Sequence, residues 1–469
     1  RRQVKAGMDV NESIGVANGT AGNAVVFAGS TVIVALLALM VPGIPFLRIM
    51  GIVAAACVLV AVLVAVTLTP AILGLLGKRI LNASQREQIG ARGEAAEVQP
   101  MSTPKAILGA LLAIAALLVV SFPALSMRLG LPDDGAEQQT STQYRSYHAI
   151  EESFGAGANG ILVVVADLPE AMTQQNQVST QLRIADAIAS RDQVKALAPM
   201  GTSKDMKTVV FQVVPKEGPN SQSTLDLVHG LRDISPLKGD IQLGVAGTAS
   251  GNIDVSAKLA DALPVYLAVV VGLSVVILTV VFRSILVPVI ASLGYLLSLF
   301  AAFGAMTAVY QWGWLSKLLQ VSTPGPILSF APIIIMGVLF GLAMDYQLFI
   351  VSGMREAHMH GMRARPSIVA GLRNGRAVVT AAALIMASVF GGFVFAELTA
   401  VRPLGFALAV GVLADAFVVR MVVVPALMHV LGGRAWWLPT WLDRILPDVD
   451  IEGAGLERSH PVVEAAAKE

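Results

Sequence analysis

The residues best suited to chemistry lie at positions 341–353, where an Asp and a Tyr are adjacent in an otherwise apolar run. A carboxylate at membrane depth costs at least a few kcal/mol, so such an acid usually faces a protein-lined cavity and marks a proton or ion path. A carboxyl group removed from water can load and release a proton near neutral pH. Asp345 and Tyr346 are therefore predicted to form a proton relay, in which Tyr346 can donate a hydrogen bond to the ionised acid. The alternatives are a permanent ion pair for Asp345 and plain packing for Tyr346.

Two glycines share the helix face of this acid. Gly337, Gly341 and Asp345 recur at every fourth position, which places them in one row along an α-helix. Small residues allow another helix to approach closely within a membrane. This face is predicted to point into a helix bundle and not into lipid.

Two more charges lie in an apolar segment near the C-terminus, Asp415 and Arg420. Positions five apart are separated by about 140° on an α-helix, so the two side chains are predicted to face different neighbours. Arg420 lies at a depth that would let it meet Asp345, but a permanent Arg partner would oppose proton loading. This favours a structural or cytoplasm-facing role for Arg420. Asp415 either lines the proton path or stabilises a helix contact.

These residues must be positioned by membrane helices, because apolar residues make up 55% of the chain and charged residues only 14%. Typical soluble proteins have about 25% charged residues. Spanning requires about 17 to 25 apolar residues. Eight such runs are predicted, at 21–41, 49–77, 106–127, 263–282, 285–310, 327–353, 377–396 and 404–431. The net charge of +1 gives no support for nucleic-acid binding.

Lys and Arg in the short loops predict the orientation. One side holds most of them, namely Arg1, Arg2, Lys5, Lys78, Arg79, Arg86, Arg92, Lys105, Arg283, Arg355, Arg363, Arg365, Arg373, Arg376 and Arg434. The other side holds Arg48, Lys317 and Arg402. The first side is predicted to be cytoplasmic, which places the polar stretch 128–261 outside the cytoplasm.

The polar stretch has the pattern of a folded domain. Strand-like runs at 161–166, 194–197, 209–214 and 241–245 alternate with helical patterns at 176–190 and 221–233. The order βαββαβ is that of the split βαβ unit of ferredoxin-like domains, although other α+β domains give a similar pattern. A further helical pattern from 248 to 263 is predicted to continue into the fourth span.

An internal repeat links the two ends of the chain. Residues 24–29 resemble 377–382, and 70–73 resemble 425–428 at nearly the same separation. The second copy is preceded by the Asp-Tyr helix, whereas the first has only a basic loop before it. We therefore expect a matching helix and domain upstream, and we expect the chain not to transport by itself.

The segments GLAMDYQLFIVSGMREA, TAAALIMASVF, GVLADAFVVRMVVVPALM and WWLPTWL resemble the second half of actinobacterial MMPL proteins, members of the resistance-nodulation-division (RND) superfamily of proton-driven exporters. The resemblance implies two six-helix halves, each with an extracytoplasmic porter domain and an Asp-Tyr proton relay. Asp345 and Tyr346 match one of these pairs. Gly353 departs from the family pattern, which often has Arg or another bulky residue there.

The implied fold is an all-α membrane bundle of RND type, with about eight of twelve expected spans and an inserted α+β ferredoxin-like porter domain. Residues 1–127 would hold the last two helices of the first half, a cytoplasmic linker at 78–105 and the first helix of the second half. The porter domain would cover 128–261 and the remaining spans 262–434. Residues 435–469 would form an interfacial segment and a disordered cytoplasmic tail.

The predicted function is proton-driven export of lipid-like or amphipathic molecules across the inner (plasma) membrane. Expected partners are protons, amphipathic or lipid substrates, membrane lipids, the missing N-terminal half and accessory envelope proteins. No cofactor, metal or enzyme activity is expected, and His358 and His360 are predicted to be solvated. Two alternatives are an accessory to protein or lipid-anchor export and, less favoured, an intramembrane aspartyl protease using Asp345 and Asp415. Ala343 stands where the protease GxGD motif needs Gly.

Overall fold

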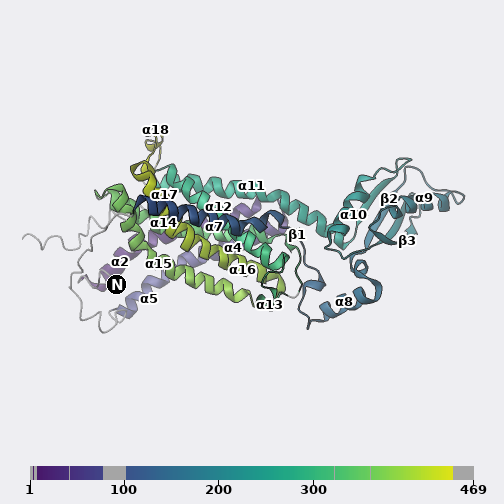
Figure 1. Cartoon of the computed structure of the whole chain (residues 1–469), viewed down its shortest axis with the longest axis horizontal. Helices are drawn as coiled ribbons and strands as arrows, with labels where there is room; N and C mark the ends of the chain where they lie inside the picture. The colour runs from purple at the N-terminus through teal and green to yellow at the C-terminus, as the bar shows by residue number, and fades with distance from the viewer. Residues whose placement is uncertain are drawn as a thin grey trace, which may run out of the picture.

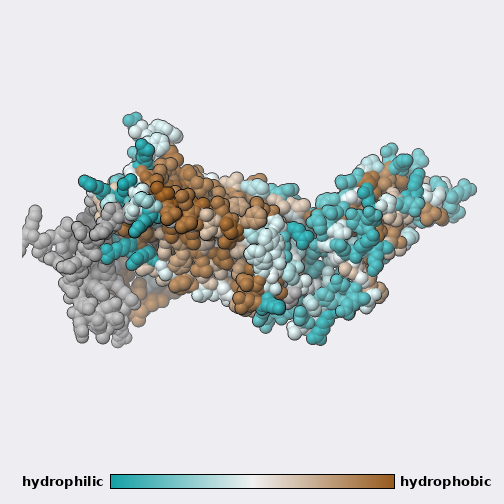
Figure 2. Space-filling model, viewed as in Figure 1, coloured by the Kyte–Doolittle hydropathy of each residue, from teal (hydrophilic) through white to brown (hydrophobic). Residues whose placement is uncertain are grey.

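The computed structural model describes residues 4, 8–41, 43–77, 102–321, 323–359 and 361–446. Most of the predicted linker 78–105, the tail beyond 446 and His360 lie outside this part of the chain. A long helical bundle carries a smaller α/β domain at one end (Figure 1). Figure 2 shows a broad hydrophobic belt around the bundle and a mostly hydrophilic surface on the α/β domain.

Seven helices in the described residues are long and apolar enough to cross a membrane. Their elements are α4 (Pro45–Val66) with α5 (Leu68–Leu76), α7 (Thr103–Ser121), α11 (Thr248–Phe282), α12 (Leu286–Met306), α14 (Ala331–Met359), α15 (Ala364–Phe393), and α16 (Arg402–Leu413) with η9 (Ala414–Val423) and α17 (Val424–Leu431).

Seven of the eight predicted spans correspond to these helices, and the first predicted run, 21–41, is also helical. The run 21–41 is a shorter apolar helix, Val25–Met40, within the helical stretch α2 (Val10–Ala17), η1 (Asn18–Gly22), α3 (Asn23–Leu37) and η2 (Ala38–Met40).

Helices α12 and α14 lie at the centre of the bundle together with the segment α16–η9–α17. Helices α12 and α14 bury most of their apolar surface, whereas α4 and α15 leave most of theirs exposed. A helix that is apolar all round is expected either inside a protein or against lipid. The bundle therefore buries the segment that contains Asp345 and presents α4 and α15 outward.

The α/β domain contains a four-stranded antiparallel sheet in the order β3-β4-β2-β5. The elements follow one another as β2 (Leu162–Asp167), α9 (Gln177–Ala189), β3 (Val194–Thr202), β4 (Thr208–Pro215), α10 (Gln222–Asp233) and β5 (Gln242–Ala246). This is the βαββαβ order predicted from the sequence. Buried and part-buried residues alternate along β4, so one face packs on the helices.

Two connections join the domain to the bundle. Helix α11 begins directly after β5 and runs for 35 residues into the bundle, as the sequence predicted. A short strand β1 (Leu129–Gly130) pairs in parallel with β6 (Ile327–Leu328), which precedes α14. Helix α8 (Thr142–Phe154) lies between β1 and the sheet. The domain is thus linked to both α11 and the base of α14.

Candidate functional site

Asp345 lies at the middle of α14, fourteen residues from Ala331 and fourteen from Met359. Its Oδ1 atom is buried and has no hydrogen-bond partner, and the same is true of the Tyr346 hydroxyl group. Buried polar atoms are nearly always hydrogen-bonded, so each exception requires an explanation such as an unseen water or a functional role. The predicted hydrogen bond from Tyr346 to Asp345 is therefore absent in this conformation.

The glycines beside Asp345 permit close helix packing. A Cβ atom at Gly337 would lie 2.7 Å from the Tyr266 hydroxyl oxygen of α11, and one at Gly341 would lie 2.8 Å from Cγ2 of Val32 on α3. The face that carries Gly337, Gly341 and Asp345 thus points toward other helices, as expected from the spacing. Asp345 is the next member of this row, so its side chain projects toward the side of α14 that packs on α3.

The prediction that Asp415 and Arg420 face different neighbours is wrong. The Arg420 Nε atom donates a hydrogen bond to Oδ2 of Asp415 over 3.1 Å. The reason is local: residues 414–423 form a π-helix, η9. A π-helix has i→i+5 hydrogen bonds, so positions five apart lie one above the other, unlike on an α-helix.

Gln347 completes this pair and was not predicted as a site residue. Its Oε1 atom accepts a hydrogen bond from Nη1 of Arg420, and both side chains are fully buried. The only signal in the sequence was an amide directly after the Asp-Tyr pair in an apolar helix. Positions two apart lie about 200° round an α-helix, so Gln347 and Asp345 are on different sides of α14. Arg420 is therefore held on the side of α14 away from Asp345, and its predicted cytoplasm-facing alternative does not fit.

Three further atoms near this pair lack partners, namely Oδ1 of Asp415, Nη2 of Arg420 and Nε2 of Gln347. Tyr346 lies between the two sides of the helix, within electrostatic range of both Asp415 and Asp345. The described bundle thus contains five unpartnered buried polar atoms on one short stretch of α14 and the facing η9. Buried polar groups of this kind are commonly bridged by water.

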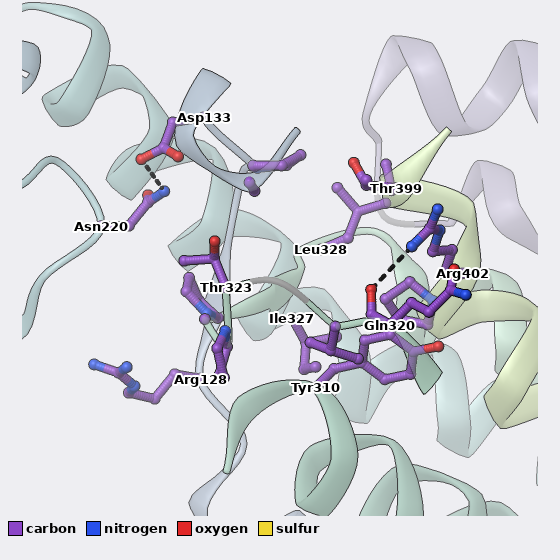
Figure 3. Close-up of a pocket in the computed structure, with 18 residues that line it drawn as sticks. Arg128, Asp133, Asn220, Tyr310, Gln320, Thr323, Ile327, Leu328, Thr399 and Arg402 are labelled. Carbon is purple, nitrogen blue, oxygen red and sulfur yellow. Dashed lines mark hydrogen bonds between the residues drawn. The ribbon is translucent and has the colours of Figure 1, made fainter. Parts of the chain in front are cut away.

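A cavity of about 260 Å³ lies where the bundle meets the α/β domain (Figure 3). Tyr310, Ile327 and Leu328 supply apolar surface, and Arg402 supplies positive charge. The guanidinium group of Arg128 points away from the other labelled residues (Figure 3). Arg402 donates hydrogen bonds to two backbone carbonyls, Ala396 from Nε over 2.7 Å and Gln320 from Nη1 over 3.1 Å. The cavity was not predicted, because its walls come from segments far apart in the sequence.

Asp133 forms the opposite end of this cavity (Figure 3). Its Oδ2 accepts hydrogen bonds from Asn220 Nδ2 over 2.8 Å and from the Tyr147 hydroxyl group over 3.2 Å. Its Oδ1 accepts one from the Gly135 backbone N–H over 3.2 Å. Burial raises the pKa of Asp133 above its usual value, although the hydrogen bonds from Tyr147 and Gly135 oppose the shift. Asp133 joins the segment after β1 to α8 and to the loop before α10.

Comparison with known proteins identifies the family. The model of the MMPL family matches residues 1–107 and 136–447. The chain belongs to the MMPL family. Membrane protein YdfJ of Bacillus subtilis is 43% identical over 98% of this chain and 63% of its own length. The mycolic acid-containing lipids exporter MmpL11 of Mycolicibacterium smegmatis is 31% identical over 96% of this chain and 48% of its own length.

The chain therefore spans about half to two thirds of the length of these MMPL relatives. A crystal structure of SecDF from Thermus thermophilus covers 91% of this chain and 51% of that chain, with a TM-score of 0.47 and 15% identity. As an MMPL member of the RND superfamily, the chain is a multi-pass membrane protein of a transporter family.

Asp415 is bound to Arg420 in the described structure. The two acids thus do not form the proton-sharing pair of an aspartyl protease.

Proposed function

We propose that this protein is a proton-driven transporter of lipid-like amphiphiles across the plasma membrane. Asp345 would accept and release the proton, and Tyr346 would pass it between the two sides of α14. The α/β domain would be an extracytoplasmic, ferredoxin-like porter domain. The observation that carries the proposal is the buried, unpartnered carboxyl oxygen of Asp345 at the middle of a central membrane helix.

The surroundings of Asp345 suit reversible protonation. A permanent cation beside the acid would keep it ionised, whereas an isolated carboxyl group in an apolar place can exist in either form. Arg420, a buried cation that contacts α14, is already bound to Asp415 and Gln347. The pair Asp415–Arg420 supports the relay by holding this charge away. Tyr346, which is 5% exposed and whose hydroxyl group has no hydrogen-bond partner, would carry the proton between Asp345 and the side of α14 that faces Asp415.

The cavity between the bundle and the α/β domain, here called the outer cavity, is suited to an amphiphilic substrate. Its apolar side chains can contact a hydrocarbon chain, while Arg402 can attract an anionic or strongly polar headgroup. Its volume of about 260 Å³ is slightly below the range usual for drug-sized ligands, so it fits a headgroup and not a whole lipid. The name of MmpL11, an exporter of mycolic acid-containing lipids, supports the same class of cargo.

Because the chain spans only about half to two thirds of the length of its relatives, the test is transport by this chain purified together with the N-terminal half expected from the internal repeat. The vesicles contain a trapped pH-sensitive dye and a fluorescent phospholipid analogue. A pH gradient should drive movement of the analogue between leaflets, and addition of the analogue should accelerate proton flux. Both signals should be lost with Asp345→Asn and kept with Glu170→Gln, a change of an exposed acid in the α/β domain. Lipid movement that is indifferent to the gradient, in protein that elutes as a single species, would contradict the proposal.

A further inference from the structure

The loop between α12 and α14 exposes a group of large apolar side chains at the end of the bundle that carries the α/β domain. We call residues 312–319 the tryptophan loop. Trp312, Trp314, Leu315 and Leu318 are 40%, 60%, 63% and 70% exposed. On its inner side, Leu319 packs against the bundle core. The loop is therefore amphipathic in place: one side is held by protein, and the other presents apolar groups outward.

The exposed side chains are presented by a defined backbone. Leu315 and Gln320 have positive φ angles of 58° and 54° and flank the single helical turn α13 (Ser316–Leu319). Residues other than glycine adopt this conformation seldom, and then only where the surroundings determine it. Here the Trp314 N–H donates to the Ala308 carbonyl over 2.9 Å, and Arg402 Nη1 donates to the Gln320 carbonyl over 3.1 Å. Leu315 and Leu318 thus point outward because the fold holds them there.

A second group of tryptophans marks the other end of the bundle. Trp437 and Trp441 are 56% and 65% exposed, and the Ile285 N–H at the start of α12 donates to the Trp437 carbonyl over 3.3 Å. The helix that begins there continues through α12 and the π-helical turn η7 (Thr307–Gln311) to Trp312. At a rise of 1.5 Å per residue, these 27 steps span about 40 Å. A bilayer including its headgroup regions is about 40–45 Å thick.

The two groups of tryptophans are therefore separated by one membrane thickness. Trp is enriched at both membrane–water interfaces, because its ring is apolar and its N–H is polar. Lys317 is exposed in the same loop, and its long side chain can reach the headgroups while its stem remains among apolar groups. In Figure 2 the hydrophobic belt continues to the edge of the bundle where Figure 1 places α13.

We propose that the tryptophan loop inserts into the headgroup and upper acyl region of the leaflet nearest the α/β domain. The occupant of this apolar surface is the lipid bilayer itself. Because Gln320 and Val321, which follow the loop, line the outer cavity, the insertion holds one wall of that cavity at the level of the lipid headgroups. This proposal does not depend on what the protein transports or on proton coupling.

Tryptophan fluorescence tests the proposal in the reconstituted whole chain. Trp436, Trp437 and Trp441 are first changed to Phe, so that Trp312 and Trp314 are the remaining tryptophans of the five. Vesicles are made from phosphatidylcholine with bromine at defined acyl positions. Bromine near the headgroup should quench the emission more strongly than bromine near the bilayer centre, and aqueous iodide should quench it weakly. A matched aqueous control replaces all five with Phe and adds Arg183→Trp on the exposed side of α9.

Two results would overturn the proposal. Emission like that of the Arg183→Trp control, with strong iodide quenching and none by brominated lipid, would place the loop in water. Emission protected from both quenchers would mean that protein covers the loop. Leu315→Gln with Leu318→Gln adds a second measurement, since it should weaken bromine quenching without changing the elution volume of the protein. Unchanged quenching in this double variant would exclude the leucines from the insertion.

Discussion

Arg420 and Asp415 form an ion pair across five residues of one helix, with 3.1 Å between Nε and Oδ2. The pair exists because η9 is a π-helix, and it lies where the Arg side chain is 0% and the Asp side chain 5% exposed. Removing one member of a buried pair leaves an uncompensated charge, which is far more costly than removing both. The ion pair between Arg420 and Asp415 therefore determines both the stability of this helix and the charge near the proposed relay.

Asp415→Asn should destabilise the protein by about 3–5 kcal/mol, because Arg420 keeps its charge in a buried site. The double variant Asp415→Leu with Arg420→Met should recover most of this loss. Thermal unfolding in detergent, followed by the loss of the monodisperse elution peak, measures both. The control is Asp443→Asn, which breaks a 2.9 Å pair between Arg283 and a half-exposed Asp443 and should cost at most about 1 kcal/mol. Equal losses in the two single variants would refute the argument.

Asp345→Asn should reduce proton-coupled transport to the level of protein-free vesicles while leaving the melting temperature nearly unchanged. The amide keeps the shape of the acid but cannot exchange a proton. Tyr346→Phe should cause a smaller loss, since it removes a hydroxyl group and not the proton acceptor. Dye-reported proton flux is the measurement, with Glu170→Gln as the matched change in an exposed acid. Normal flux in the Asn variant would remove Asp345 from the relay.

Gly341→Ala should destabilise the bundle by about 1–3 kcal/mol, the usual cost of overpacking. The new methyl group would lie 2.8 Å from Cγ2 of Val32. Val32→Ala in the same chain should restore part of the loss by removing that atom. Gly272→Ala is the control, because a Cβ atom at this position of α11 would have no neighbouring atom within 4 Å. The melting temperature should be lowest for Gly341→Ala, higher for Gly341→Ala with Val32→Ala, and highest for Gly272→Ala. An unchanged melting temperature in Gly341→Ala would show that α3 is not packed this closely.

Asp133 should make the stability of the protein depend on pH. Burial raises the pKa of Asp133 in the folded protein above the usual value of 3.8. A raised folded-state pKa gives a contribution that is complete below the unfolded value and is lost as pH rises through the folded value. The melting temperature of the wild type should therefore fall, relative to Asp133→Asn, as pH increases across this window. Parallel melting curves for the two proteins would show that Asp133 titrates normally.

The α/β domain should be extracytoplasmic. In a Cys57→Ala background, which removes the single native Cys, Glu170→Cys in the α/β domain should react with a membrane-impermeant thiol reagent in intact cells. Met359→Cys, at the exposed end of α14, should react only after the cells are opened. The opposite pattern would invert the topology.

The sequence was a good guide where one physical rule dominates. Apolar length predicted the seven long spans. Strand-like runs and helical periods predicted the order of β2, α9, β3, β4, α10 and β5. The four-residue spacing of Gly337, Gly341 and Asp345 predicted a packed face, because α14 is a regular α-helix there. In each case the pattern needed only neighbours along the chain.

The failures came where the local geometry departed from the assumed period or depended on distant segments. At the α-helical angle of 100° per residue, Asp415 and Arg420 would point in different directions, but the π-helix brings them together. Gln347 gains its role from Arg420, which is 73 residues away. The outer cavity joins Asp133, Asn220 and Arg402. The periodicity within one segment cannot predict a contact among residues from three separate segments.

The continuity of α11 from the α/β domain into the bundle determines how far a tilt of this helix moves the domain. Pro264 lies inside this helix, where it leaves the carbonyl of Ala260 without a backbone donor and so softens one point of an otherwise stiff rod. Residues 248–263 form an arm of about 24 Å on the domain side of this point. A tilt of about 10° would swing the tip of such an arm by about 4 Å. The domain and the membrane helices therefore cannot move independently by more than this pivot allows, and the length of the arm sets how far a small rotation in the membrane is amplified outside it.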